Sequence, residues 1–157
     1  MIRGFGMSQA AASYSIISDN GNLITDWICR GLKEDMSWVG EHYTCGFVYD
    51  DRLIGGVIFH NLRPGHDVWW TIYTTDKRWC NSRVLHFLFA TAFDGLGCRR
   101  INLLVSKSNQ ACLRLVKGLG FKIEGCLRDY RENGEDCYIL GILKNEAKFY
   151  FKNKGEK

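Results

Sequence analysis

Residues 99–128, RRINLLVSKSNQACLRLVKGLGFKIEGCLR, decide the fold of this chain. Apolar side chains alternate with others over residues 100–105, which predicts a half-buried strand. Apolar side chains then recur at helical spacing over residues 112–119, and residues 121–127 return to an extended pattern. The stretch therefore predicts a strand, an amphipathic helix and a second strand in close succession.

The expected helix carries signals at both ends. Ser106, Ser108 and Asn109 precede it, and their side-chain oxygens can accept hydrogen bonds from its first backbone N–H groups. Gly118 and Gly120 come at its end, where glycine readily adopts the left-handed conformation that terminates a helix. Both signals agree with the apolar spacing between them.

The rest of the chain predicts helices and strands that surround this unit. Upstream we expect strands at 14–17, 43–49, 52–60 and 68–74, helices at 22–32 and 82–96, and a helical turn within 33–40. Downstream we expect a strand at 136–143 and a last strand at 149–151. Without a repeat or linker, residues 1–157 should form a single domain, with 1–13 as a flexible arm and 146–157 as a basic tail.

Composition narrows the class of protein. Hydrophobic residues make up 46% of the chain, enough for a substantial core. The formal net charge of +4 is too small to indicate nucleic-acid binding, although it suits an anionic ligand. No apolar run has the length of a membrane span or a signal peptide, and the seven cysteines show no zinc-type spacing. We therefore expect a cytoplasmic protein with reduced thiols and no metal.

The motifs in residues 99–128 resemble those of the GNAT acetyltransferase superfamily, which follows a strand with N-x-x-[S/A], a helix, G-F, E-G and L-R. The matching residues here are Asn109 to Cys112, Gly120-Phe121, Glu124-Gly125 and Leu127-Arg128. The sequence is most similar to the branch that acetylates the N-termini of ribosomal proteins, and to small GNAT-like proteins encoded by bacteriophages. Residues 43–143 follow the family's order of elements.

This resemblance implies an α/β (α+β) fold: one domain with a mixed, mostly antiparallel sheet, splayed at its centre, and flanking helices. It implies that acetyl-CoA enters the gap between the fourth and fifth strands, and that an amine of a peptide, protein or small molecule accepts the acetyl group. A phage-encoded relative would act in the host cytoplasm or in the virion. The sequence leaves the acceptor and the oligomeric state open.

The resemblance places the pyrophosphate of acetyl-CoA where a loop enters the 82–96 helix, because backbone N–H groups and the helix dipole favour an anion there. The family motif is [Q/R]-x-x-G-x-[G/A], but this chain reads RWCNSR over residues 78–83, without glycine. In one alternative the arginine side chains hold the phosphates; in the other, a tryptophan and an arginine fill the cleft. The candidate cofactor contacts are Thr74, Arg78, Trp79, Asn81, Ser82, Arg83 and Asn109.

Acetyl transfer needs a base for the amine, an N–H group for the oxyanion and an acid for the leaving thiolate. The resemblance places the N–H group within residues 70–74. Val116 stands where the family often has a tyrosine acid, so Cys112 is either the acid or a buried apolar side chain. Asp67 is either the base or a capping carboxylate. The other candidate bases are Glu41, His60, His66 and Glu124.

Three functions are compatible with these observations. The first is an N-acetyltransferase that uses acetyl-CoA. The second is a GNAT-like binding or structural protein that has lost catalysis, for example in a phage particle or against a host protein. Transfer of another acyl or aminoacyl group is a third alternative. We favour the enzyme, since arginine side chains can replace glycine amides as phosphate ligands.

Overall fold

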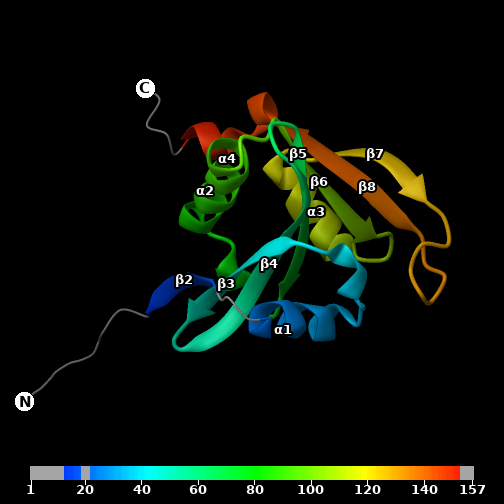
Figure 1. Cartoon of the computed structure of the whole chain (residues 1–157), viewed down its shortest axis with the longest axis horizontal. Helices are drawn as coiled ribbons and strands as arrows, with labels where there is room; N and C mark the ends of the chain where they lie inside the picture. The colour runs from blue at the N-terminus through cyan, green and yellow to red at the C-terminus, as the bar shows by residue number, and fades with distance from the viewer. Residues whose placement is uncertain (1–12, 19–21, 153–157) are drawn as a thin grey trace, which may run out of the picture.

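The computed structural model describes residues 13–18 and 22–152, so the expected arm up to residue 12 and the end of the basic tail lie outside the described residues. Within these ranges seven strands form one sheet, in the order β2-β3-β4-β5-β6-β8-β7 (Figure 1). The strands are β2 (Tyr14–Ser18), β3 (His42–Tyr49), β4 (Arg52–Arg63), β5 (Asp67–Thr74), β6 (Arg100–Ser106), β7 (Lys122–Leu127) and β8 (Cys137–Leu143). The helices are α1 (Leu23–Leu32), α2 (Ser82–Ala90), α3 (Gln110–Leu119) and α4 (Lys148–Lys152).

The sheet is splayed at its centre. β5 and β6 are its one parallel pair within the described residues, and their pairing runs only from Asp67–Arg100 to Trp70–Leu103. The other neighbouring strands are antiparallel and pair over most of their length. Beyond Trp70 the two central strands separate, and this gap lies between the fourth and fifth described strands. The expected fold class, including the splayed sheet, is confirmed.

The helices cover both faces of the sheet because side chains alternate along its strands. On β4, Val57 and Phe59 join the large core beneath α2 and α3, whereas Ile58 between them joins a smaller cluster beneath α1. Figure 1 shows α2 and α4 side by side, away from α1. The two faces of the sheet therefore carry separate core clusters.

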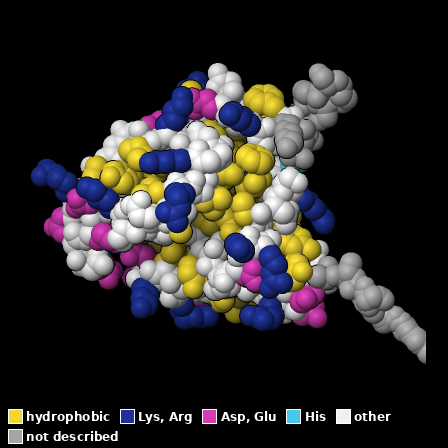
Figure 2. Space-filling model, turned by 180° about the vertical axis from the view of Figure 1, so that it is seen from behind, with side chains coloured by type: hydrophobic (Ala, Val, Ile, Leu, Met, Phe, Trp, Pro, Cys, Tyr) yellow, Lys and Arg dark blue, Asp and Glu magenta, His cyan; other side chains and the backbone are white. Residues whose placement is uncertain are grey.

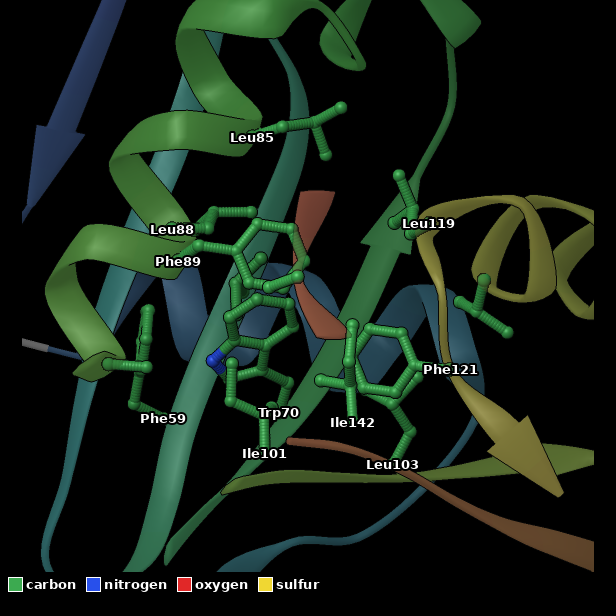
Figure 3. Close-up of a cluster of buried hydrophobic side chains, with 14 of the residues drawn as sticks. Phe59, Trp70, Leu85, Leu88, Phe89, Ile101, Leu103, Leu119, Phe121 and Ile142 are labelled. Atoms are coloured by element: carbon green, nitrogen blue, oxygen red, sulfur yellow. The ribbon is translucent and has the colours of Figure 1, made fainter. Parts of the chain in front are cut away.

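An aromatic cluster fills the larger core where the two central strands still pair (Figure 3). The ring of Trp70 lies 5.3 Å from that of Phe89 on α2 and 6.0 Å from that of Phe121, which follows α3. Trp70 is only 2% exposed, and burying such a side chain contributes roughly 2–3 kcal/mol. The cluster ties both helices to the closed end of the gap.

The end of the chain differs from the sequence prediction. Residues 148–152 form α4, so the expected strand at 149–151 is wrong, and this part of the expected basic tail is helical. Tyr150 is 2% exposed, packs edge-on against Phe93 and donates a hydrogen bond of 2.7 Å to Asp94. Three consecutive aromatic residues fit a strand pattern, but burial against α2 selects the helix.

Most other elements agree with their expected bounds. The helical turn within 33–40 is a single turn, η1 (Ser37–Val39), and β4 extends three residues beyond the expected end at 60. The helix expected at 82–96 continues past Ala90 as the wider turn η3 (Thr91–Gly95). A second short turn, η2 (Lys77–Trp79), precedes α2, and a third, η4 (Lys144–Glu146), precedes α4.

Candidate active site

A cleft of about 680 Å³ opens where β5 and β6 separate. Its floor consists of β5 residues 69–72 and β6 residues 104–106. One wall is the segment 32–38 that follows α1, the other is the β7–β8 loop at 130–135, and the N-terminus of α3 closes one side. The cleft therefore joins segments that are up to about a hundred residues apart in the sequence.

A backbone N–H group of β5 points into this gap. The N–H of Thr75 donates to the carbonyl of Ile54 on β4 with a length of 2.9 Å. Since successive N–H groups of a strand point to opposite sides, those of Tyr73 and Thr71 also face β4, and that of Ile72 faces β6. The pairing with β6 has ended at Trp70, so Ile72 presents the first N–H group beyond the ladder.

A chain of three polar side chains lies at the edge of the cleft. His60 on β4 is 5% exposed, and its Nε2 lies 2.9 Å from the hydroxyl of Thr71 on β5. Its Nδ1 lies 3.2 Å from the side-chain oxygen of Asn61. Burial lowers the pKa of His60, although the hydrogen bond with Asn61 acts in the opposite direction. The imidazole is therefore neutral at pH 7.

The N-terminus of α3 brings Asn109 and Cys112 to the cleft. Asn109 caps the helix, because its side-chain oxygen accepts a hydrogen bond of 3.2 Å from the backbone N–H of Cys112. The Cys112 side chain is half-buried, and burial raises the pKa of its thiol. The thiol thus keeps its proton at neutral pH.

Asp67, the expected base, lies at the closed end of the gap and does not line the cleft. Its two oxygens accept hydrogen bonds from Arg63, at 2.6 Å, and from Asn102, at 2.8 Å. Burial acts to raise the pKa of Asp67, but these hydrogen bonds and the neighbouring arginines lower it overall. This geometry favours the structural alternative, a carboxylate that links the end of β4 to β6.

The loop before α2 holds Arg78 and Trp79 in place on the side of β3. The Nε of Arg78 donates to Asp76 at 3.0 Å and its guanidinium lies 4.2 Å from the ring centre of Tyr49. These hydrogen bonds lower the pKa of Asp76 to about 2. Trp79 is buried and stacks on Phe47 at 5.8 Å. Neither side chain lines the cleft between β5 and β6.

The remaining loop residues lie at the start of α2. Asn81 is its N-cap and accepts a hydrogen bond of 3.0 Å from the N–H of Val84. Ser82 and Arg83 are exposed in the first turn, and Thr74 is half-buried at the end of β5. The structure thus gives Asn81 a structural role, while Ser82 and Arg83 remain accessible to a ligand.

The two walls of the cleft meet through an ion pair. Arg131, from the β7–β8 loop, lies 3.2 Å from Glu34 after α1 and donates to Ser106 on β6 at 3.0 Å. Sequence reasoning missed this ion pair, because 97 residues separate its partners and neither segment has a motif. His60 was among the candidate bases, but its partner Thr71 carried no signal in the sequence. Glu41, His66 and Glu124 do not line the cleft.

Two further features of the described residues bear on the site. No helix there is both long and apolar enough to span a membrane. The same part of the chain contains no group of three or more His, Cys, Asp or Glu side chains arranged to hold a metal ion.

Comparisons with known proteins agree with this geometry. Residues 17–121 match the model of the acetyltransferase (GNAT) family. YoaA from Bacillus subtilis, an uncharacterised N-acetyltransferase, is 33% identical over 102 residues, which cover 59% of this chain and 56% of YoaA. The match therefore spans little more than half of that relative, and none of these matches points to a phage.

Solved structures share the fold at low sequence identity. IAA acetyltransferase from Bacillus cereus gives a TM-score of 0.70 at 16% identity, with 83% of this chain and 99% of that chain covered. Spermidine N-acetyltransferase from Vibrio cholerae gives a TM-score of 0.68 at 17% identity, with 91% of this chain and 98% of that chain covered. Ribosomal-protein-S5-alanine acetyltransferase from Vibrio fischeri gives a TM-score of 0.57 at 20% identity, with 68% of this chain and 64% of that chain covered. From its family match, its splayed sheet and the cleft at its centre, the chain belongs to the GNAT acetyltransferase family.

Proposed function

We propose that this protein is an N-acetyltransferase that transfers the acetyl group of acetyl-CoA to a cationic amine bound in the cleft. The observation that carries the proposal is the Ile72 N–H group at the open gap, within a cleft that is closed by the N-terminus of α3. A strand N–H at this point can stabilise the oxyanion that forms when an amine attacks a thioester.

The described residues fit acetyl-CoA. Ser82 and Arg83 are accessible at the N-terminus of α2, where an anion is favoured, and Trp79 is anchored on Phe47 rather than in the gap. Figure 2 shows hydrophobic side chains gathered in the middle of one face, with Lys and Arg side chains around them. Such a surface suits a ligand with an apolar arm and a charged phosphate end.

The walls of the cleft favour an acceptor with more than one positive charge. Four carboxylates line it, those of Glu34, Asp35, Glu132 and Glu135, against two cations, Lys33 and Arg131. The Arg131–Glu34 ion pair offsets one charge of each sign, so the lining stays negative. Trp38 is 61% exposed at the same wall and offers an aromatic face to a cation. A polyamine such as spermidine, or the basic N-terminus of a peptide, fits this lining.

Binding of acetyl-CoA is tested by thermal shift. Acetyl-CoA at 100 times its dissociation constant should stabilise the protein by ~2.7 kcal/mol. Arg83→Ala should weaken the affinity roughly tenfold through loss of a phosphate contact. Arg78→Ala is the matched control, since its guanidinium is already paired with Asp76, and its affinity should stay close to that of the wild type. No shift at millimolar acetyl-CoA would reject the enzyme and support the non-catalytic alternative.

The acceptor is tested with amines that differ in charge. Spermidine should give a higher kcat/KM than butylamine, and its advantage should shrink as salt screens the carboxylates. Equal values for the two amines would contradict a preference for a polycation. A strong preference for a peptide with N-terminal alanine would instead support the ribosomal-protein branch.

A further inference from the structure

We propose that Thr71 and His60 form a proton relay that deprotonates the acceptor amine, with Asn61 holding the imidazole in the required tautomer. This proposal rests on the proposed acetyltransferase function. Nδ1 of His60 contacts an amide oxygen and Nε2 contacts a hydroxyl. This difference defines the direction of proton transfer, from the hydroxyl to Nε2.

The tautomer follows from hydrogen-bond chemistry. The side-chain oxygen of Asn61 can only accept a hydrogen bond, so Nδ1 of His60 must carry the proton. Nε2 is then a free acceptor, and the hydroxyl of Thr71 donates to it at 2.9 Å. A hydroxyl that donates to a neutral imidazole keeps its oxygen lone pairs available to a proton from the cleft. The arrangement of a hydroxyl, an imidazole and a third group that orients the imidazole is the general one by which a neighbouring base activates a hydroxyl.

The location of Thr71 suits this role. Thr71 immediately precedes Ile72, whose N–H group faces the gap, and both residues line the cleft together with His60. An amine bound here would have a proton acceptor and an oxyanion donor on adjacent residues of one strand. Asn61 adopts a left-handed φ of +51°, which is uncommon for a residue other than glycine and fixes the carboxamide beside the ring.

The proton transfers balance. The ammonium form of the acceptor gives one proton to Thr71, and the hydroxyl proton of Thr71 passes to Nε2 of His60. The neutral amine then forms a bond to the thioester carbon, the C–S bond breaks, and the remaining amine proton goes to the departing thiolate. His60 finally releases its proton to solvent, so the products are the amide, CoA thiol and one proton.

Other charged groups face the relay. His42 on β3 pairs with His60 across the strands, and its charge acts to lower the pKa of His60. The cleft walls add Lys33, Glu34 and Asp35 on one side, and Arg131, Glu132 and Glu135 on the other. The effect of these groups on a pH profile of activity must be distinguished from that of His60.

The first test is ¹⁵N NMR of the imidazoles, with and without acetyl-CoA. His60 should be neutral at pH 7 with the proton on Nδ1, and its resonance should disappear in His60→Gln. A protonated ring, or a proton on Nε2, would overturn the relay whether or not the protein transfers acetyl groups.

The second test is the pH profile of kcat/KM with spermidine and acetyl-CoA. His60→Gln and Thr71→Val should each lower kcat/KM about 100-fold at pH 7, and the double variant should lose no more than either single variant. Thr71→Ser should stay within about threefold of the wild type. Asn61→Asp should move the acid limb to higher pH, because a carboxylate stabilises the imidazolium. A purely structural pair would leave this limb unmoved.

Two controls complete the experiment. His66→Gln changes an exposed loop histidine, and His42→Gln removes the neighbouring ring; both should keep an acid limb. Wild-type protein that transfers no acetyl group would refute the proposed function. Wild-type transfer with unchanged His60→Gln or Thr71→Val would refute the relay alone.

Discussion

The protonation of the leaving thiolate can depend on a single side chain. We propose that Cys112 donates this proton and regains one from the amide nitrogen, so that the net transfer is from the amine to the thiolate. The position of the family's usual tyrosine holds Val116, which is 1% exposed within the core and has no proton to give. Cys112 lines the cleft, and burial raises the pKa of its thiol above the ordinary 9.0. The raised pKa keeps the proton in place at neutral pH, although it also makes the thiol a weaker acid.

We expect Cys112→Ala to lower kcat by roughly 100-fold, because general acids typically contribute at least that much. Cys112→Ser should restore most of the rate, since a hydroxyl can donate from the same position. Stopped-flow measurement of thiol release at pH 7 gives both numbers. A rate for Cys112→Ala within about threefold of the wild type would leave Cys112 as an apolar side chain beside the cleft.

Sequence patterns identify whole elements better than they identify the contacts between them. The 99–128 stretch folds as expected, with Asn109 as the N-cap of α3 and Gly120 in the left-handed region after it. Local rules of capping and periodicity suffice there, because neighbours in sequence supply the partners. The relay of His60 and Thr71 and the Arg131–Glu34 pair depend on strand register and loop packing, which no local pattern encodes. The expected strand at 149–151 failed for the same reason.

The end of α3 offers a sharp test of these local rules. Gly120 has a φ of +113°, and a Cβ there would lie 3.1 Å from Ile142 and 3.2 Å from the carbonyl of Glu146. Gly120→Ala should therefore lower the free energy of unfolding by about 1–3 kcal/mol. Gly118→Ala, inside the same helix with nothing within 4 Å, should raise it by about 0.5–1 kcal/mol. Urea denaturation measures the free energy of unfolding of both variants. Equal changes in the two would contradict the left-handed backbone of Gly120 as the cause.

At the level of the complete chain, the sheet consists of two parts that share a short junction. β2 to β5 form one part and β6 to β8 the other, and the four residue pairs from Asp67–Arg100 to Trp70–Leu103 join them. The core cluster around Trp70 reinforces the junction at its closed end. Past this point each strand has an edge that faces the gap, so a ligand there would complete the sheet that the protein leaves open.

Hydrogen exchange should reveal this completion. Acetyl-CoA should slow amide exchange at Ile72 and Thr74 on β5 and at Ser106 on β6, because these alternate N–H groups face the gap and have no ladder partner there. It should also slow exchange at residues 82–84, where α2 begins, if its phosphates bind there. The β2–β3 pairing, at residues 14–18 and 45–49, lies at the far edge of the sheet and should exchange at an unchanged rate. Slowing confined to α2 would mean that the nucleotide binds without its acyl arm entering the gap, and acetyl transfer in the cleft would then be ruled out.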